Sequence, residues 1–140
     1  MPYPKRTRDQ HFDNGNGPKR ILALDGGGLR GILTLGILQA IENELRGRHD
    51  KDASFRLCHY FDMIAGTSTG AIIAAALAIG MTVNEITAKY RDLGSRVFKR
   101  SLLRQGLVRA KYDDAQLIEE LKAVYGSETT LGDTKLQTGL

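Results

Sequence analysis

The chain has 140 residues and a net charge of +4, with 20 lysine and arginine residues against 16 aspartate and glutamate residues. This length fits one domain, and a hydrophobic content of 41% excludes a chain that is disordered throughout. A single cysteine excludes an intrachain disulfide framework and a cysteine-rich zinc site. The longest apolar run, residues 71–79, is far shorter than the ~20 residues of a membrane span, and the basic N-terminus lacks the apolar stretch of a secretory signal. We therefore expect a reducing, cytoplasmic compartment.

The positive charge is concentrated in one segment. Residues 89–111 contain eight basic residues and one acidic residue. Such a segment indicates an anionic partner, namely a lipid surface, a nucleotide or a nucleic acid, or else a solvated helix face. Few aromatic residues are interleaved with these charges, so nucleic acid is the least favoured partner.

The first half of the chain predicts two strands, each followed by glycines and a helix. Residues 1–19 are polar and basic and predict a flexible arm. Residues 21–24 form a short apolar run that predicts a buried strand. Helical spacing follows from residue 32 and ends at Gly47. Residues 61–65 predict a second strand, and the apolar residues 71–79 predict a buried helix.

The second half predicts two further helices. Thr82 and Glu85 match a capping box that opens a helix to about residue 97. Asp113 or Asp114 caps another helix to about residue 125, and residues 136–140 begin a strand. The order strand–helix–strand–helix predicts an α/β fold with a parallel sheet, formed by one domain over residues 20–140.

A G-x-S-x-G pentapeptide joins the second strand to its helix, with Ser68 at its centre. In this context the serine sits on a sharp turn with a strained backbone, so that its hydroxyl projects freely. Side chains at positions 66 and 70 would collide, which explains the glycines. The N-terminus of the following helix favours a developing negative charge. The alternative is a plain turn in which Ser68 only caps the helix.

A second glycine-rich segment follows the first strand directly. Gly26, Gly27 and Gly28 leave bare backbone N–H groups that can converge on an oxyanion, and Arg30 adds positive charge or orients the loop. A phosphate-binding P-loop is disfavoured because no Gly-Lys-Ser/Thr follows. The spacing of Gly26, Gly28 and Gly31 also fits the dinucleotide pattern G-x-G-x-x-G, which is weak by itself.

Together the two segments resemble the patatin-like phospholipase family, on the residues Leu24-Asp25-Gly26-Gly27-Gly28-Leu29-Arg30-Gly31 and Phe61-Asp62-Met63-Ile64-Ala65-Gly66-Thr67-Ser68-Thr69-Gly70. The resemblance implies a three-layer α/β sandwich with a mainly parallel central sheet, of which residues 20–140 are the N-terminal part and which is incomplete at the C-terminus. It also implies a serine lipid acyl hydrolase of phospholipase A type with a Ser–Asp dyad.

The resemblance assigns roles to particular residues. Ser68 is the nucleophile, the oxyanion loop comprises Gly26, Gly27, Gly28 and Arg30, and the nucleophile elbow comprises Gly66, Thr67, Thr69 and Gly70. No metal or cofactor is implied. The implied partners are a phospholipid or other glycerolipid and a membrane surface contacted peripherally. A homo-oligomer is compatible with the sequence, and so is control by small nucleotides, which switch on some bacterial members of the family.

The catalytic base is missing from these residues. The three histidines, His11, His49 and His59, all precede Ser68, so the triad order Ser–Asp–His is impossible here. The family takes its base from an Asp-Gly motif, and Asp-Gly occurs only at Asp25, before Ser68. We expect Asp25 to brace the glycine loop, His59 to be structural and the base to lie outside this chain. Two alternatives are a non-catalytic or regulatory module that lacks the base, and a nucleotide-binding domain.

Overall fold

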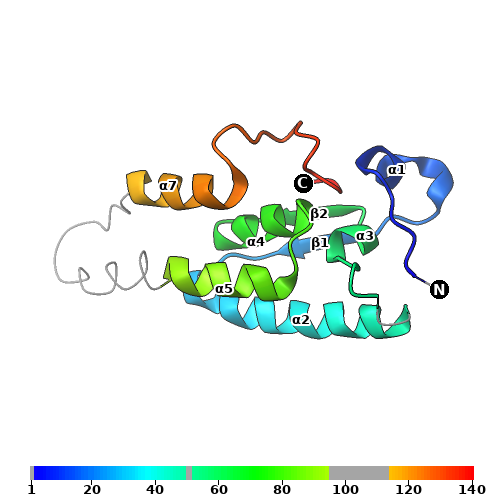
Figure 1. Ribbon diagram of the computed structural model, residues 1–140, viewed down its shortest axis with the longest axis horizontal. Coiled ribbons are helices and arrows are strands. Elements are labelled where there is room, and N and C mark those ends of the chain that lie inside the picture. The colour runs from blue at the N-terminus through cyan, green and yellow to red at the C-terminus, as the bar shows by residue number, and fades with distance from the viewer. Residues whose placement is uncertain (1, 50–51, 95–113) are drawn as a thin grey trace.

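The computed structural model describes residues 2–49, 52–94 and 114–140 (Figure 1). Two parallel strands, β1 (Ile21–Leu24) and β2 (Met63–Gly66), form its sheet. Their register places Ile21 opposite Met63 and Leu24 opposite Gly66. The long helix α2 (Gly31–Arg48) makes the crossover between them, as a parallel pair requires. Because the strands are parallel and Leu24 lies opposite Gly66, the glycine-containing loops that follow β1 and β2 emerge at the same edge of the sheet.

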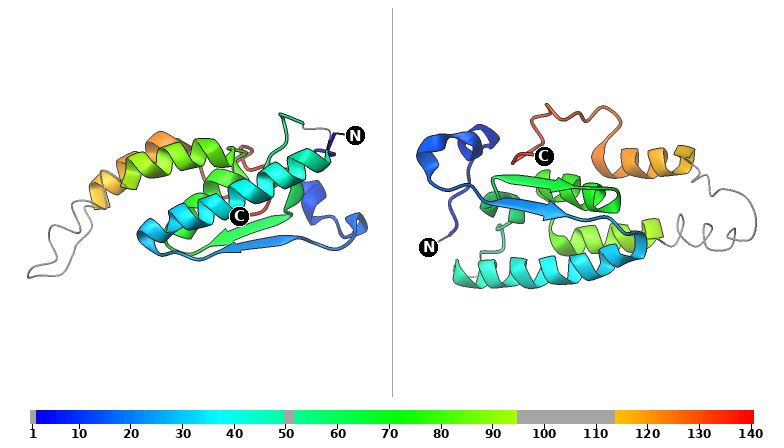
Figure 2. Two further views of the ribbon diagram at one scale, coloured as in Figure 1. Left: turned by 90° about the horizontal axis from the view of Figure 1, so that it is seen from below. Right: turned by 180° about the vertical axis from the view of Figure 1, so that it is seen from behind.

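The other helices complete the order that the sequence predicts. They are α1 (Arg8–Phe12), α3 (Leu57–Tyr60), α4 (Thr69–Ala78), α5 (Val83–Leu93) and α7 (Asp114–Tyr125), with 3-10 turns η1 (Asn14–Asn16) and η2 (Gly28–Arg30). Helices α2, α4 and α5 lie on one side of the sheet, and the strands are uncovered when seen from behind (Figure 2). The parallel α/β architecture is thus confirmed, and the described residues supply the sheet and one helical layer.

The core forms where α4 covers the sheet. Ile64 of β2, and Ile73 and Leu77 of α4, are fully buried and join one hydrophobic cluster with Leu35 and Leu38 of α2. Helix α4 is nearly all apolar because it is buried on several sides. Within the described ranges, no helix combines the length and the apolar composition needed to cross a membrane.

Most predicted boundaries agree with the structure within two residues. The capping box at the start of α5 is confirmed, with Thr82 N–H donating to Glu85 Oε2 at 2.8 Å. Helix α4 begins two residues earlier than predicted, and α2 continues one residue past Gly47. Gly139 forms a parallel bridge with Met63, so the predicted last strand begins beside β2. The basic residues 95–111 and the cap at Asp113 lie outside the described residues.

The N-terminal segment differs from the expected flexible arm. Helix α1 is capped by Thr7, and His11 on it is fully buried. His11 Nδ1 lies 2.8 Å from Asp62 Oδ1, and the Arg20 N–H donates to Asp62 Oδ2 at 2.8 Å. The segment docks through these buried polar contacts and through Tyr3, whose ring packs against Phe55 and Tyr60.

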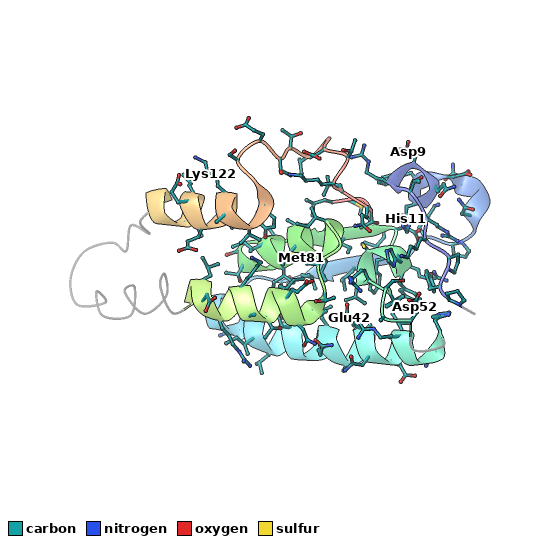
Figure 3. The ribbon with its side chains drawn as sticks, viewed as in Figure 1. Asp9, His11, Glu42, Asp52, Met81 and Lys122 are labelled. Carbon is teal, nitrogen blue, oxygen red and sulfur yellow. The ribbon has the colours of Figure 1, made fainter. Side chains whose placement is uncertain are left out.

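A buried carboxyl group joins α2 to α5. Glu42 is fully buried and accepts a hydrogen bond from the Val83 N–H at 3.3 Å, at the start of α5 (Figure 3). Arg46 Nη2 lies 3.6 Å from the same oxygen, Oε2. Burial raises the pKa of Glu42 above its ordinary value of 4.5, against the lowering effect of these partners. The folded protein therefore disfavours the carboxylate, and its stability falls as the pH rises through the folded pKa.

We expect Glu42→Gln to raise the thermal unfolding midpoint at pH 7. The amide oxygen can still accept from the Val83 N–H, and the substitution removes the buried carboxylate charge. The difference from wild type should shrink at pH 4, where Glu42 itself is protonated. Glu44→Gln is the matched control, since the Glu44 side chain is exposed and its ion pair with Arg48 is worth little. A Glu42→Gln protein that is less stable than wild type at pH 7 contradicts the prediction.

Candidate active site

Ser68 lies at the turn between β2 and α4 in a conformation that side chains rarely adopt. Its φ is 51° and its ψ is −126°, and no other non-glycine residue in the described ranges has a positive φ. Such a conformation costs about 1–3 kcal/mol and persists only where the surrounding structure imposes it. The predicted strained elbow is therefore present.

The hydroxyl of Ser68 is not used by the fold. The residue is exposed, and its side chain does not cap α4. Within the described ranges, no group forms a hydrogen bond with Oγ. Ser68 is the N-cap residue of α4, but its side chain makes no capping hydrogen bond. Backbone bonds hold the turn instead, from Thr67 N–H to Leu24 O at 3.0 Å and from Gly70 N–H to Thr67 O at 2.9 Å.

Two close backbone approaches require the glycines of the elbow. A Cβ on Gly66 would overlap the backbone of Gly70 and lie 2.6 Å from the Ala71 nitrogen. A Cβ on Gly70 would lie 2.5 Å from the Leu24 carbonyl oxygen, at the end of β1. Because backbone atoms cannot move aside as a flexible side chain can, only glycine fits at both positions.

The glycine loop after β1 lies directly against Ser68. A Cβ on Gly26 would be 2.6 Å from Ser68 Cβ and 3.3 Å from its Oγ. The Gly26 N–H donates to Thr67 Oγ1 and the Gly27 N–H to Thr69 Oγ1, both at 3.2 Å. The two threonines that flank Ser68 thus tie the loop to the elbow.

The remaining part of the loop turns through two glycines. Gly27 has φ 150° and Gly28 has φ 56°, so side chains would be strained at both positions. In the described part of the chain, no group accepts a hydrogen bond from the Gly28 N–H. Arg30 is exposed, and its N–H donates to the Gly27 carbonyl at 3.1 Å. The structure therefore brings together all the predicted site residues on one edge of the sheet.

One residue of this site escaped sequence analysis. Tyr90 of α5 is buried, and its hydroxyl donates to the Gly28 carbonyl oxygen. It lies 62 residues from Gly28 in the chain. Its only sequence signal is its position on the apolar face of a predicted amphipathic helix, which does not distinguish it from core residues.

Within the described ranges, no carboxylate or imidazole forms a hydrogen bond with Ser68 Oγ. His11 pairs with Asp62, just before β2, whereas Ser68 follows β2, and a four-residue strand spans roughly 13 Å. His59 precedes β2 as well, accepts from the Arg56 N–H at 3.1 Å, and has a pKa that burial lowers. It has the structural role that the sequence predicts. Asp25 is exposed, and no described group donates to its carboxylate, so the expected brace is not found there.

Among the described residues, no group of three or more His, Cys, Asp and Glu side chains is placed to hold a metal ion. The geometry suits covalent chemistry at one hydroxyl instead. An exposed serine in a strained turn at the N-terminus of a helix, with a glycine loop packed against it, is an arrangement that acyl transfer can use.

Comparison with known proteins gives the family. The profile of the patatin-like phospholipase family, Patatin, matches residues 22–139. The chain belongs to the patatin-like phospholipase family. The match includes both glycine-rich segments of this patatin-like chain. It also includes α2, β2 and α4 and all but the first residue of β1. The family is one of hydrolases that act on lipids, so the geometry at Ser68 agrees with its membership.

Individual relatives are similar over most of this chain. A cGAMP-activated phospholipase of Escherichia coli is 35% identical over 118 residues, which are 81% of this chain and 33% of that protein. Patatin-16 of Solanum tuberosum is 33% identical over 127 residues, 86% of this chain and 30% of that protein. Probable inactive patatin-3-Kuras 1 of the same plant is 32% identical over 127 residues, 86% of this chain and 32% of that protein. The chain thus spans about a third of the length of these relatives.

Proposed function

We propose that this chain carries the nucleophile and the oxyanion donors of a serine lipid acyl hydrolase that cleaves ester bonds of glycerolipids. The observation that carries the proposal is the conformation of Ser68, with φ 51° and an unbonded, exposed hydroxyl against the Gly26 backbone. A fold maintains such strain where function uses it. The family supplies the substrate class. Cleavage of the ester bond between an acyl chain and the glycerol of a phospholipid is a phospholipase A-type activity.

The proposed reaction uses an acyl-enzyme. Ser68 Oγ attacks the ester carbonyl while an aspartate outside these residues accepts its proton. The negative charge on the tetrahedral oxygen is held by the N–H groups of Gly28 and Thr69, and collapse expels the alcohol, which takes the proton. Water then attacks the acyl-serine in the same way and releases a fatty acid. Thr69 opens α4, so the helix dipole also favours the oxyanion.

The remaining loop residues have supporting roles in this proposal. The amides of Gly26 and Gly27 are already bonded to the threonine hydroxyls, so they hold the loop in place. Arg30 adds positive charge at the loop. A cytoplasmic location with peripheral contact at membranes, anionic lipid as the partner of the basic segment, and a homo-oligomer all stay predictions.

A fluorophosphonate probe tests the proposal directly. We expect the protein that contains this chain to gain one adduct, which peptide mass spectrometry maps to Ser68. The reaction should be run without and with cGAMP, because relatives are named for activation by that nucleotide. Ser54→Ala is the control: Ser54 lies beside a carboxylate, with its hydroxyl 2.7 Å from Asp52 Oδ1, but has no elbow around it. Its loss should leave labelling unchanged.

The second candidate is a module that keeps the fold without catalysis. Two observations favour it: no described group serves as a base for Ser68, and one relative is named as probably inactive. No adduct in either condition, from a protein shown by circular dichroism to be folded, overturns the hydrolase proposal in favour of this module. An adduct mapped to another serine also contradicts the assignment of Ser68.

A further inference from the structure

Tyr90 connects α5 to the glycine loop through two contacts. Its side chain is 3% exposed, and its hydroxyl donates to the Gly28 carbonyl oxygen. Its ring also lies against the first residue of α2, since a Cβ on Gly31 would be 2.5 Å from Tyr90 Cζ. The tyrosine therefore occupies the space between the loop and α2 that a side chain at position 31 would otherwise fill.

These contacts act on the most adaptable part of the loop. Gly28 has φ 56° and no side chain, so packing of its own cannot select its conformation. Because the peptide group is planar, a hydrogen bond to the Gly28 carbonyl fixes the orientation of the whole peptide that follows. With the carbonyl held, rotation about the Gly28 backbone is restricted, and its N–H keeps one direction.

We propose that Tyr90 is a positioning residue, which holds Gly28 so that its N–H is preorganised for the oxyanion. This inference rests on the proposed function. Preorganised donors cost no rearrangement during reaction, whereas a donor that must be ordered stabilises the transition state less. Tyr90 acts through Gly28 and does not itself touch the reacting atoms.

The experiment compares two tyrosine-to-phenylalanine substitutions in the protein that contains this chain. Tyr90→Phe removes the hydroxyl that holds Gly28. Tyr125→Phe removes a hydroxyl that donates to another backbone carbonyl, that of Ile72 on α4, at 2.6 Å. Each variant thus loses a hydrogen bond from a tyrosine to a backbone carbonyl, but only Tyr90→Phe affects a bond to the glycine loop.

We expect Tyr90→Phe to lower kcat for a short-chain p-nitrophenyl ester by about 10-fold with KM nearly unchanged. Labelling of Ser68 by the fluorophosphonate should slow by a similar factor. Tyr125→Phe should leave both rates within about twofold of wild type. Gly31→Ala is a second variant, because its methyl group displaces the Tyr90 hydroxyl, and it should lower kcat in the same way.

The outcomes separate this inference from the proposed function. A wild-type protein that the probe does not label overturns the proposed function and this inference with it. A labelled wild type with unchanged kcat in Tyr90→Phe overturns the inference alone. Equal losses in Tyr90→Phe and Tyr125→Phe, or a change in KM only, also overturn it, because a merely structural role gives those results.

Discussion

Replacing Ser68 by alanine is expected to reduce ester hydrolysis by about 10⁴-fold or more and to abolish labelling by the fluorophosphonate. The substitution removes the attacking oxygen while the amides of the glycine loop and α4 remain. Those donors and substrate binding give only the residual acceleration. The measurement is kcat for a glycerolipid ester, with the thermal unfolding midpoint taken alongside.

Substitutions of Ser68 should abolish activity without lowering the stability of the protein. The Ser68 hydroxyl has no hydrogen bond within the described ranges, so Ser68→Ala should unfold near the wild-type temperature. Ser68→Gly should unfold at a higher temperature, because glycine adopts φ 51° without strain. We expect its free energy of unfolding to rise by about 1 kcal/mol. Hydrolysis that survives either change at more than about a tenth of the wild-type rate contradicts the assignment of Ser68 as nucleophile.

Replacing Gly70 by alanine is expected to destabilise the protein by about 3 kcal/mol or more and to prevent labelling of Ser68. Its new Cβ would lie 2.5 Å from the Leu24 carbonyl oxygen and 2.8 Å from that of Asp25. Both are backbone atoms, so α4 and β1 must separate to make room. That movement displaces the loop from the elbow. Urea unfolding measures the loss of stability.

The long helix α2 offers a matched control for this effect. A Cβ on Gly36 meets no atom within 4 Å, and Gly36 lies inside the helix. Gly36→Ala should therefore stabilise the protein by about 0.5–1 kcal/mol, because alanine favours helix. If Gly70→Ala unfolds at the same urea concentration as wild type, the backbone approach seen at Gly70 does not constrain the site as inferred here.

Local patterns were sufficient for the elements that carry the site. The apolar runs before the glycines predict β1 and β2, and the capping box between Thr82 and Glu85 predicts the start of α5. The pentapeptide around Ser68 predicts a strained turn. Each of these depends on residues a few positions apart, so the physics is contained in the sequence itself.

Other features depend on residues far apart in the chain. The docking of the N-terminal segment needs Asp62 as the partner of His11, 51 residues away. Helix α3 has only four residues, too few for a periodic signal, and forms because Leu57 and Cys58 are buried. The expected brace at Asp25 was inferred from proximity in sequence, but the structure ties the loop through Thr67 and Thr69 instead.

The sequence by itself determined the family, the α/β order and the position of the proposed nucleophile, because strand, turn and helix signals around Ser68 are all local. Only the tertiary structure decided that the Gly26 and Gly27 amides are bonded to threonine hydroxyls, that no described residue accepts from the Gly28 N–H, and that Tyr90 donates to the Gly28 carbonyl. The direction of a backbone N–H depends on the groups that surround it. In this chain those groups are Thr67 and Thr69, on either side of Ser68, and Tyr90 of α5, which lie beside the glycine loop only after folding.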